Sequence, residues 1–432
     1  MTIKSLFVQT IGDIHINKSI MKIILITDYT PTEDNFNGPS AITYHILKEL
    51  KDIHDVYIYT TNANKVPYSM VQKSIKTFNR KLKVTPRNLW MKLLISRKTH
   101  FLFNFLYKNN NISPVSRYKL PKNILNEITQ LNPDLILVYP YFLLNVQKQL
   151  CNFNIAAIGP DCYTLHTLRA FQDSYLYSSK NVKKEIKHLL QQITLEQKIA
   201  QYTNKIFLVG IEDNIQYQTI IQNKNKSFFL PHPHYNLKEK DIDFTNKKIF
   251  SVIITGKYDL YTYSDINALT KSLQEYQSVL SNFQFTFLGK TWRPIVEQLS
   301  KQINVNLIEW VEDYTKEIMK HDIQICPISL GTGTKGKVLD ALANGLLCIG
   351  SKYAFENIAV KHNISCIQYK NVNEIPHILL SITQFPQKYA EIAQNGRQQI
   401  RTYHSPKLIA ELLLKLAINN DNQININNYL FQ

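Results

Sequence analysis

The sequence has few cysteines and no long apolar segment. Its 432 residues include five cysteines, an odd number whose spacing fits neither a zinc site nor a disulfide framework. Cys326 and Cys348 fall in segments that we expect to be buried strands, where cysteine behaves as a small hydrophobic residue. No apolar run reaches the roughly 18–20 residues that are needed to cross a bilayer. We therefore expect reduced thiols, no transmembrane helix and a cytoplasmic location.

Acidic residues are also scarce, and one long segment has none. The chain carries 50 Lys and Arg against 33 Asp and Glu, and residues 71–125 hold thirteen of the basic residues and no acid. Leu, Phe and Trp are interspersed among them. Basic charge mixed with large apolar side chains favours a surface that lies in an anionic lipid interface at the inner face of the cell membrane. Nucleic acid would attract the same charge, and a solvated basic face around a buried helix is the third interpretation.

Only twelve residues are glycine, yet three of them, Gly331, Gly333 and Gly336, lie within six positions. An apolar strand pattern precedes them, and a helical pattern followed by a second apolar strand comes after. Glycine lets a ligand approach the backbone closely, and the unpaired amides at a helix start attract phosphate. We predict a phosphate-binding loop here. The alternative is an ordinary connection in a parallel sheet, with the glycines serving only as turns.

Charged side chains surround this expected loop. Lys335 and Lys337 add positive charge to it, and Asp340 lies further along the helix. Helical side chains lean toward the N-terminus, so the Asp340 carboxylate could reach the same ligand. A phosphate loop with a nearby carboxylate indicates a nucleotide site in which the carboxylate binds the ribose hydroxyls.

This segment resembles the nucleotide-sugar motif of the group 1 (family 4) glycosyltransferases, which have the GT-B fold. The matching residues are Gly331, Gly333, Lys335, Lys337, Ala341, Ala343 and Gly345. Asp340 takes the place of the glutamate that holds the donor ribose in the family. Thr332 stands where many members carry a second glutamate that contacts the donor sugar. The resemblance implies a nucleoside diphosphate sugar as donor, bound by the loop that also includes Thr334, and it implies no metal and no cofactor.

Two further stretches of the second half resemble donor-binding segments of the family. Lys257 follows an apolar strand and stands where members often place a base that binds the donor phosphates. A lone turn lysine is the alternative. Trp310 and Val311 are the candidates for contact with the nucleotide base, although Trp310 could equally be a core residue. Asp313 is expected to cap a helix rather than to act in catalysis.

In the first half, the resemblance points to residues that face the cleft. Asp161 matches an acid that follows a buried strand, with Pro160 in the place of the histidine that usually precedes it. His166 is the candidate substitute, so Asp161 and His166 are the predicted catalytic residues. Gly38 resembles part of the glycine loop near the acceptor and the donor phosphates, and Arg169 is a further candidate for those contacts.

We expect no role in the site for two further acids and two histidines. Glu196 and Asp213 resemble acids that are common in the first domain of the family, but helix capping or surface exposure explains them adequately. His232 and His234 are not spaced with the cysteines or acids that a metal site requires. We therefore expect no metal.

Short apolar runs alternate with longer amphipathic segments along the whole chain, which is the pattern of parallel sheets covered by helices. The expected strands are 22–27, 56–60, 134–139, 155–159, 205–210 and 227–230 in the first half, and 249–255, 284–288, 305–309, 323–327, 346–350 and 365–368 in the second. Together with the resemblance, this predicts an α/β protein of GT-B architecture, with two six-stranded Rossmann-like domains facing a central cleft.

The expected organisation has five parts. They are an N-terminal extension (1–20), with Met21 as an alternative start, an acceptor domain (21–235), a linker (236–248), a donor domain (249–404), and a crossing helix with an Asn-rich tail (405–432). The apolar stretch Leu6–Val8 is short and is followed by Asp13, so we expect no signal peptide.

The function that we expect from these residues is a retaining, metal-independent transfer of a hexose-type sugar to a glycan or a lipid-linked acceptor. The resemblance implies a place in the biosynthesis of surface polysaccharide, such as lipopolysaccharide or capsule. Two alternatives stay open. One is a non-catalytic protein that binds nucleotide sugars or the membrane surface, and the other is a nucleotide-sugar epimerase.

Overall fold

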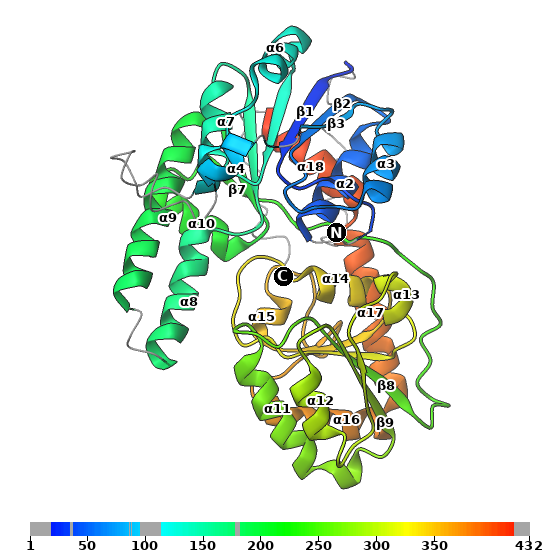
Figure 1. Ribbon diagram of the computed structural model, residues 1–432. Helices are drawn as coiled ribbons and strands as arrows, with labels where there is room; N and C mark the ends of the chain where they lie inside the picture. Colours follow the sequence, from blue (N-terminus) through cyan, green and yellow to red (C-terminus); the bar gives the residue numbers. More distant parts are fainter. Residues whose placement is uncertain are drawn as a thin grey trace.

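The computed structural model describes residues 19–34, 38–85, 87, 89–95, 114–177 and 182–418, which form two parallel sheets with helices on their faces (Figure 1). The N-terminal extension 1–18 and the Asn-rich tail from residue 419 lie outside the described residues. Both sheets consist only of parallel strands. Two Rossmann-like sheets of this kind confirm the predicted α/β class and GT-B architecture.

The first sheet has seven strands rather than the predicted six. In spatial order they are β3 (Leu82–Val84), β2 (Asp55–Thr60), β1 (Lys22–Thr27), β4 (Leu135–Tyr139), β5 (Ile155–Gly159), β6 (Lys205–Leu208) and β7 (Ser227–Phe229). The strand missing from the prediction is β3. It has three residues at the sheet edge, one of them a lysine, so its sequence shows no apolar run of strand length.

The second sheet has the six strands that were predicted. In spatial order they are β10 (Val305–Ile308), β9 (Phe283–Leu288), β8 (Phe250–Thr255), β11 (Ile323–Cys326), β12 (Leu347–Gly350) and β13 (Ile367–Gln368). The four residues of β11 and the four of β12 are all buried. Burial on both faces is what continuous apolar runs produce in a parallel sheet covered by helices.

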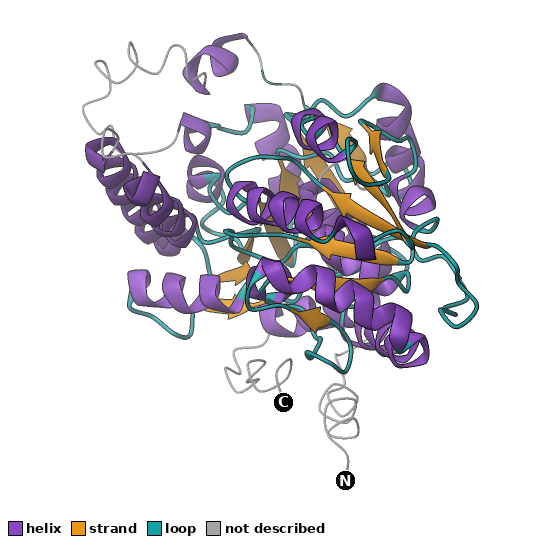
Figure 2. Ribbon diagram, turned by 90° about the horizontal axis from the view of Figure 1, so that it is seen from below, coloured by secondary structure: helices purple, strands orange, loops and turns teal. Residues whose placement is uncertain are grey.

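Helices cover both faces of each sheet (Figure 2). In the first half they are α2 (Gly38–Leu50), α3 (Tyr68–Thr77), α4 (Leu89–Ile95), α6 (Lys122–Leu131), α7 (Leu144–Gln149), α8 (Tyr163–Tyr177), α9 (Val182–Tyr202) and α10 (Ile211–Ile221). In the second half they are α11 (Tyr263–Glu275), α12 (Arg293–Leu299), α13 (Tyr314–Ile318), α14 (Gly336–Ala343), α15 (Lys352–Phe355), α16 (Ile375–Gln384), α17 (Pro386–Tyr403) and α18 (Pro406–Ile418). Short 3₁₀ turns occupy Pro114–Arg117, Gln277–Val279 and Val372–Glu374.

The last helix returns to the first sheet. In Figure 1, α17 packs within the lower body and α18 lies in the upper one, beside α2. Seven apolar residues of α18, from Ile409 to Ala417, are buried in the same core as β1 and α2. The Lys205 ammonium of β6 donates to the Leu416 carbonyl at 2.5 Å, so the C-terminal end of α18 is also held by a charge. The chain therefore passes between the two sheets twice, once through 236–248 and once between α17 and α18.

Candidate active site

The glycine loop follows β11 and leads into α14, as the sequence predicted. Gly333 has φ +61°, a conformation that residues with a side chain rarely adopt. Lys335 precedes the first turn of α14 and its side chain makes no capping bond there. The positive end of the helix therefore faces the space between the sheets.

Two cavities open at this helix start, with volumes of about 460 Å³ and about 620 Å³. Both are lined by residues of the first half and of the second half. The residues common to both are Asp161, Gly256, Lys257, Thr332, Thr334, Gly336 and Lys337. Because the carboxyl ends of β5, β8 and β11 all point here, the site lies where α/β folds usually bind ligands.

Three lysines lie near the start of α14, and their surroundings differ. Lys257 and Lys337 line both cavities, and burial, with the charge of Lys257 as the next cause, lowers the pKa of Lys337. The Lys335 ammonium instead donates to the Thr332 and Gly333 carbonyls at 2.8 and 3.0 Å. Burial also lowers the pKa of Lys335. Lys335 thus stabilises the shape of the loop and lines only the smaller cavity, while Lys257 and Lys337 line both cavities.

Asp340 is buried in α14, with 2 % of its surface exposed. It lines neither cavity. Its negative charge contributes to the raised pKa of Tyr235 and of Tyr314, which both line the larger cavity, so Asp340 is close to that wall. Its contact with a ribose stays a prediction.

The two predicted catalytic residues lie on the side of the first sheet that faces the loop. Asp161 follows β5 and lines both cavities. His166, on α8, reaches the loop: its Nδ1 lies 3.2 Å from the Thr332 hydroxyl and its Nε2 lies 3.0 Å from the Tyr261 hydroxyl. Burial lowers the pKa of His166, which favours the neutral ring. The structure thus brings Asp161, His166 and Thr332 to one wall of the site.

Arg169 also reaches the loop, but its guanidinium is already paired. It makes a bidentate ion pair with Glu356, at 2.7 and 2.9 Å, and donates to the Gly331 carbonyl. It lines neither cavity. Its predicted contact with acceptor or phosphate is therefore untested, and its visible role is to join α8 to the second half of the chain.

The predicted base-binding pair borders the larger cavity. Trp310 is 69 % exposed, which rules out the alternative of a core position, and Val311 is partly buried beside it. Asp313 caps α13 by accepting from the Lys316 amide at 2.8 Å, as expected. Gly38 starts α2 and lines the same cavity from the first half.

Comparisons with known proteins bear on this site. A family model described as "Glycosyl transferases group 1" matches residues 250–382, the stretch that holds Lys257, the glycine loop and α14. Residues 250–382 form a group 1 glycosyl transferase domain. A search of curated proteins finds no significant match in sequence.

The fold of the whole chain is similar to those of solved glycosyltransferase structures at low identity. HepE of Anabaena in complex with UDP-glucose has a TM-score of 0.62 at 11% identity, covering 91% of this chain and 98% of that one. TarM has a TM-score of 0.63 at 12% identity, covering 93% and 99%. A sucrose-phosphate synthase from Thermosynechococcus elongatus has a TM-score of 0.59 at 13% identity, covering 91% and 98%. The chain therefore has the GT-B fold over more than nine-tenths of its length.

Glu196 and Asp213, for which we expected helix capping or surface exposure, are both buried, so surface exposure was the wrong explanation. Glu196 is fully buried and accepts from the Tyr163 amide at 2.7 Å and from the Tyr141 and Thr164 hydroxyls, both at 2.5 Å. It thereby caps α8. Burial raises the pKa of Glu196.

Asp213, in the first turn of α10, is the second acid. It is fully buried and accepts from the Gly333 amide of the group 1 domain at 3.0 Å. Burial and the charge of Asp161 raise the pKa of Asp213 to about 7. Its position just after the carboxyl end of β6 is the sequence signal that could have placed it at the site.

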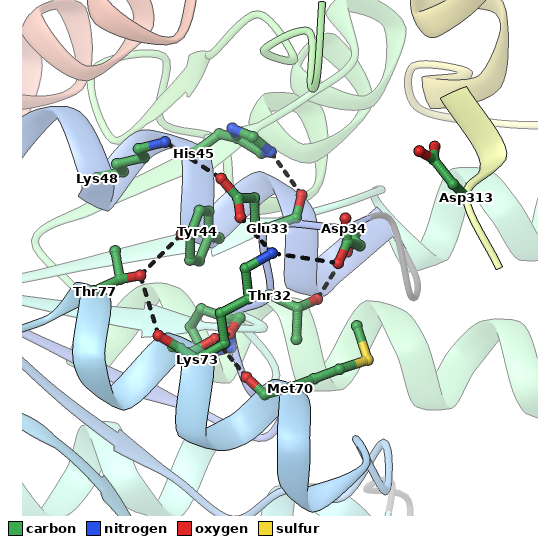
Figure 3. A network of polar contacts seen from close by, with 12 residues as sticks. Thr32, Glu33, Asp34, Tyr44, His45, Lys48, Met70, Lys73, Thr77 and Asp313 are labelled. Atoms are coloured by element: carbon green, nitrogen blue, oxygen red, sulfur yellow. Dashed lines mark hydrogen bonds and ion pairs between the residues drawn. The ribbon is translucent and has the colours of Figure 1, made fainter. Parts of the chain in front are cut away.

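The loop after β1 is tied to the helices that flank it (Figure 3). The Lys73 ammonium of α3 lies 2.7 Å from Glu33 and 3.9 Å from Asp34, and the His45 ring of α2 lies 3.0 Å from the Glu33 carbonyl. The hydrogen bond from Lys73 lowers the pKa of Glu33. This part of the predicted acceptor loop is therefore built into the first domain, while residues 35–37 lie outside the described residues.

In the folded protein, part of the positive charge of the basic segment 71–125 is neutralised by ion pairs. Four of its cations pair with acids from outside the segment: Lys73 with Glu33, Lys81 with Asp55, Lys83 with Glu127, and Arg87 with Asp28. Lys76, Arg80 and Lys92 are exposed. Residues 96–113, which hold Arg97, Lys98 and most of its aromatic residues, lie outside the described part.

Two other expectations concern metals and membranes. Among the described residues, no group of three or more His, Cys, Asp or Glu side chains is placed to hold a metal ion. In the same part of the chain, none of the helices combines the length and apolar character of a membrane span.

Proposed function

We propose that this protein is a retaining glycosyltransferase that moves a sugar from a UDP-sugar to a hydroxyl group of a glycan or a lipid-linked acceptor. The observation that carries the proposal is that a positively charged surface of the second half and a polar surface of the first half line the same cavity. The start of α14 with Lys257 and Lys337 faces Asp161 and His166 across the smaller cavity. A diphosphate needs the first surface, and an acceptor hydroxyl needs polar groups such as those on the second.

The structural neighbours support UDP-sugars as the donor class. HepE is described in complex with UDP-glucose, and TarM has been described in complex with UDP. In this chain, the exposed ring of Trp310 at the larger cavity offers an apolar surface for a base. Asp340 would hold the ribose. The larger cavity would then take the nucleoside, and the smaller one the sugar.

The positive groups would act on the leaving diphosphate. Negative charge builds on the departing oxygen as the glycosidic bond breaks. The first amides of α14, Lys257 and Lys337 would stabilise that charge, with Lys335 shaping the loop. We propose that this arrangement makes the transfer independent of metal. Full activity in the presence of a chelator such as EDTA would support this, and loss of activity restored by Mg²⁺ would refute it.

The donor class can be tested by binding. The protein is titrated with UDP-, GDP-, ADP- and CMP-sugars and its thermal unfolding is followed. A ligand at about 100 times its dissociation constant should add about 2.7 kcal/mol to the free energy of unfolding. We expect stabilisation by UDP-sugars, and a loss of that stabilisation in Asp340→Ala. Equal stabilisation of the variant and the wild type would remove Asp340 from the ribose site.

Turnover is tested with the best donor by measuring UDP release and transfer. Lys257→Ala should lower kcat by a factor of about 10² to 10³, the usual loss when one group that stabilises the developing charge is removed. Lys271→Ala, on the exposed face of α11, is the matched control and should retain wild-type activity. Binding without any turnover would favour a nucleotide-sugar-binding protein. This alternative has one observation behind it, because both ring nitrogens of His166 already have partners.

We further propose an acceptor at the inner membrane surface, as in the assembly of surface polysaccharide. Support comes from α4, where Leu89 and Leu93 are 75% and 36% exposed beside Lys92. Sedimentation with vesicles tests this part. Binding to vesicles rich in phosphatidylglycerol, weakened in a Leu89→Asp, Leu93→Asp double variant, is expected. Equal sedimentation with neutral and anionic vesicles would contradict it, and salt-sensitive binding to RNA or DNA would favour the nucleic-acid alternative.

A further inference from the structure

The peptide of Gly333 is held from both sides by residues that belong to different halves of the molecule. Its amide donates to Asp213 Oδ2 at 3.0 Å, and its carbonyl accepts from the Asn357 side-chain amide at 3.1 Å. Asn357, which follows α15, uses its side-chain oxygen to accept from the Ile211 amide of α10 at 2.8 Å. Asp213, Gly333 and Asn357 thus form a closed set of bonds between α10 and the glycine loop, which we call the Gly333 clasp.

Asp213 is anchored in the first domain independently of the loop. Its Oδ1 accepts from the Cys162 amide at 2.8 Å, next to Asp161. Both carboxylate oxygens therefore receive backbone amides, one from each domain. The charged or titratable groups around it are Asp161, Lys335, Arg169 and Cys162. Asp161 repels the Asp213 charge, whereas Lys335 and Arg169 stabilise it.

The clasp sets the distance between the two predicted functional surfaces. A Cβ atom built on Gly333 would lie 2.2 Å from Asp161 Oδ1 and 2.6 Å from the Pro160 carbonyl. The glycine loop and the turn after β5 therefore approach so closely that only a residue without a Cβ atom fits at position 333. No donor or acceptor needs to touch Asp213 or Asn357 for these two residues to fix where the donor phosphates lie relative to Asp161.

We propose that Asp213 and Asn357 are positioning residues that lock the glycine loop onto the first domain when the cleft is closed. This inference rests on the proposed glycosyltransferase function for its kinetic consequence, but not for its structural one. A buried carboxylate can accept an amide on each of its two oxygens only while it is ionised, because protonation turns one oxygen into an O–H donor that faces an N–H. The lock therefore weakens when Asp213 takes up a proton.

The structural consequence is tested by hydrogen exchange in the absence of any substrate. Asp213→Asn replaces one accepting oxygen with an NH₂ group that faces a backbone amide, so one of the two bonds is lost. Amides of residues 329–336 should exchange at least about ten times faster in Asp213→Asn and in Asn357→Ala than in the wild type. The control is Asp322→Asn. Asp322 is also buried and accepts from the Ser251 amide, at 3.1 Å, but it lies at the opposite end of β11.

The kinetic consequence is tested with the same variants. With a UDP-sugar, Asp213→Asn should lower kcat about ten- to a hundredfold, while the dissociation constant for UDP changes by less than about threefold. Wild-type kcat should fall as the pH drops below about 7, because the pKa of Asp213 is raised to about 7, and this step should be absent in Asp213→Asn. Asp322→Asn should keep both kcat and the pH step.

The outcomes separate the two proposals. A wild type without any transfer refutes the proposed function, and the exchange measurement still decides on the clasp. Wild-type exchange rates in both clasp variants, or a fall in kcat that Asp322→Asn shares, would overturn the inference.

Discussion

At the scale of single residues, Gly333 carries the steric constraint that sets how closely the two halves of the site approach each other. It combines φ +61° with contacts that leave no room for a methyl group. A side chain there must either unwind the loop or push the turn at Pro160 and Asp161 away. Either change separates the two surfaces that the site brings together.

We therefore expect Gly333→Ala to fold but to lose at least about 99% of its transfer activity, since a displacement of about 1 Å from the reactive geometry can lower a rate a hundredfold. The comparison is Gly345→Ala, at the other end of α14. Gly345 also has a positive φ, +83°, but the added Cβ would meet mainly the Ile242 side chain, at 2.7 Å. Gly345→Ala should lower the melting temperature and keep kcat in the folded fraction. Equal activity losses in the two variants would contradict this interpretation.

The sequence indicated some of these residues and could not indicate others. Gly331, Gly333 and the lysines of the loop are local in sequence, and their spacing alone predicts a phosphate site. The roles of Asp213 and Glu356 depend on partners 120 and 187 residues away, at Gly333 and Arg169. Periodicity carries no information about such pairs. For Asp340, the motif predicts a contact with the donor ribose, and the lining of the two cavities does not test that contact.

At the scale of elements, the two connections between the sheets are joined to each other. His404, between α17 and α18, lies against the stretch that follows β7: its Nδ1 is 2.7 Å from the His232 carbonyl, and its own carbonyl accepts from the His234 amide at 2.8 Å. Its Nε2 accepts from the Ala359 amide at 3.1 Å. The ring is fully buried and must therefore be a neutral Nδ1–H tautomer.

The buried histidines where the two connections meet should make the stability of the protein depend on pH. Burial lowers the pKa of His404 to about 3 and that of His232 to about 4. The unfolded chain therefore binds more protons than the native one below pH about 6.5, and stability is lost as the pH falls through that window. We expect wild type to lose about 2 kcal/mol more than His404→Gln between pH 7 and pH 5, measured by urea unfolding. Parallel pH profiles of the two proteins would contradict the prediction.

Several strands could be predicted because each contains an uninterrupted run of four or five apolar residues, as in β1 and β4. The edge strand β3 could not, because half-exposed edges need no apolar run. The net charge that segment 71–125 presents in the folded protein could not be predicted from the sequence for a related reason. Its charge is partly neutralised by Glu33, Asp55, Glu127 and Asp28, which the fold brings in from other elements.

At the scale of the whole molecule, the ion pair between Arg169 and Glu356 joins the two halves of the chain. Arg169 of α8 and Glu356 beside α15 are each 16% exposed and bind in a bidentate geometry. A partly buried pair of this kind is lost at a high free-energy cost when one partner is removed, because the other charge stays desolvated.

A charge exchange tests whether this pair contributes to closure. Arg169→Glu and Glu356→Arg should each lower kcat/KM about ten- to a hundredfold, which corresponds to the roughly 1.5–3 kcal/mol of a charged hydrogen bond. The double exchange should recover part of the loss, and the recovery is measured as the coupling energy of a double-mutant cycle. Additive losses in the double variant would show that the two side chains act independently.

The return of α18 to the first sheet has a consequence for synthesis. The core around β1 and α2 includes Ile409, Leu413 and Leu416, which are made almost four hundred residues after β1. A nascent chain released into solution up to α10 would expose that apolar surface until the second sheet and α17 had also been translated. The first domain, although first in the chain, can complete its core only after the last helix leaves the ribosome. During translation, the apolar surface of the first domain therefore stays exposed for longer than that of a domain whose core is contiguous in sequence.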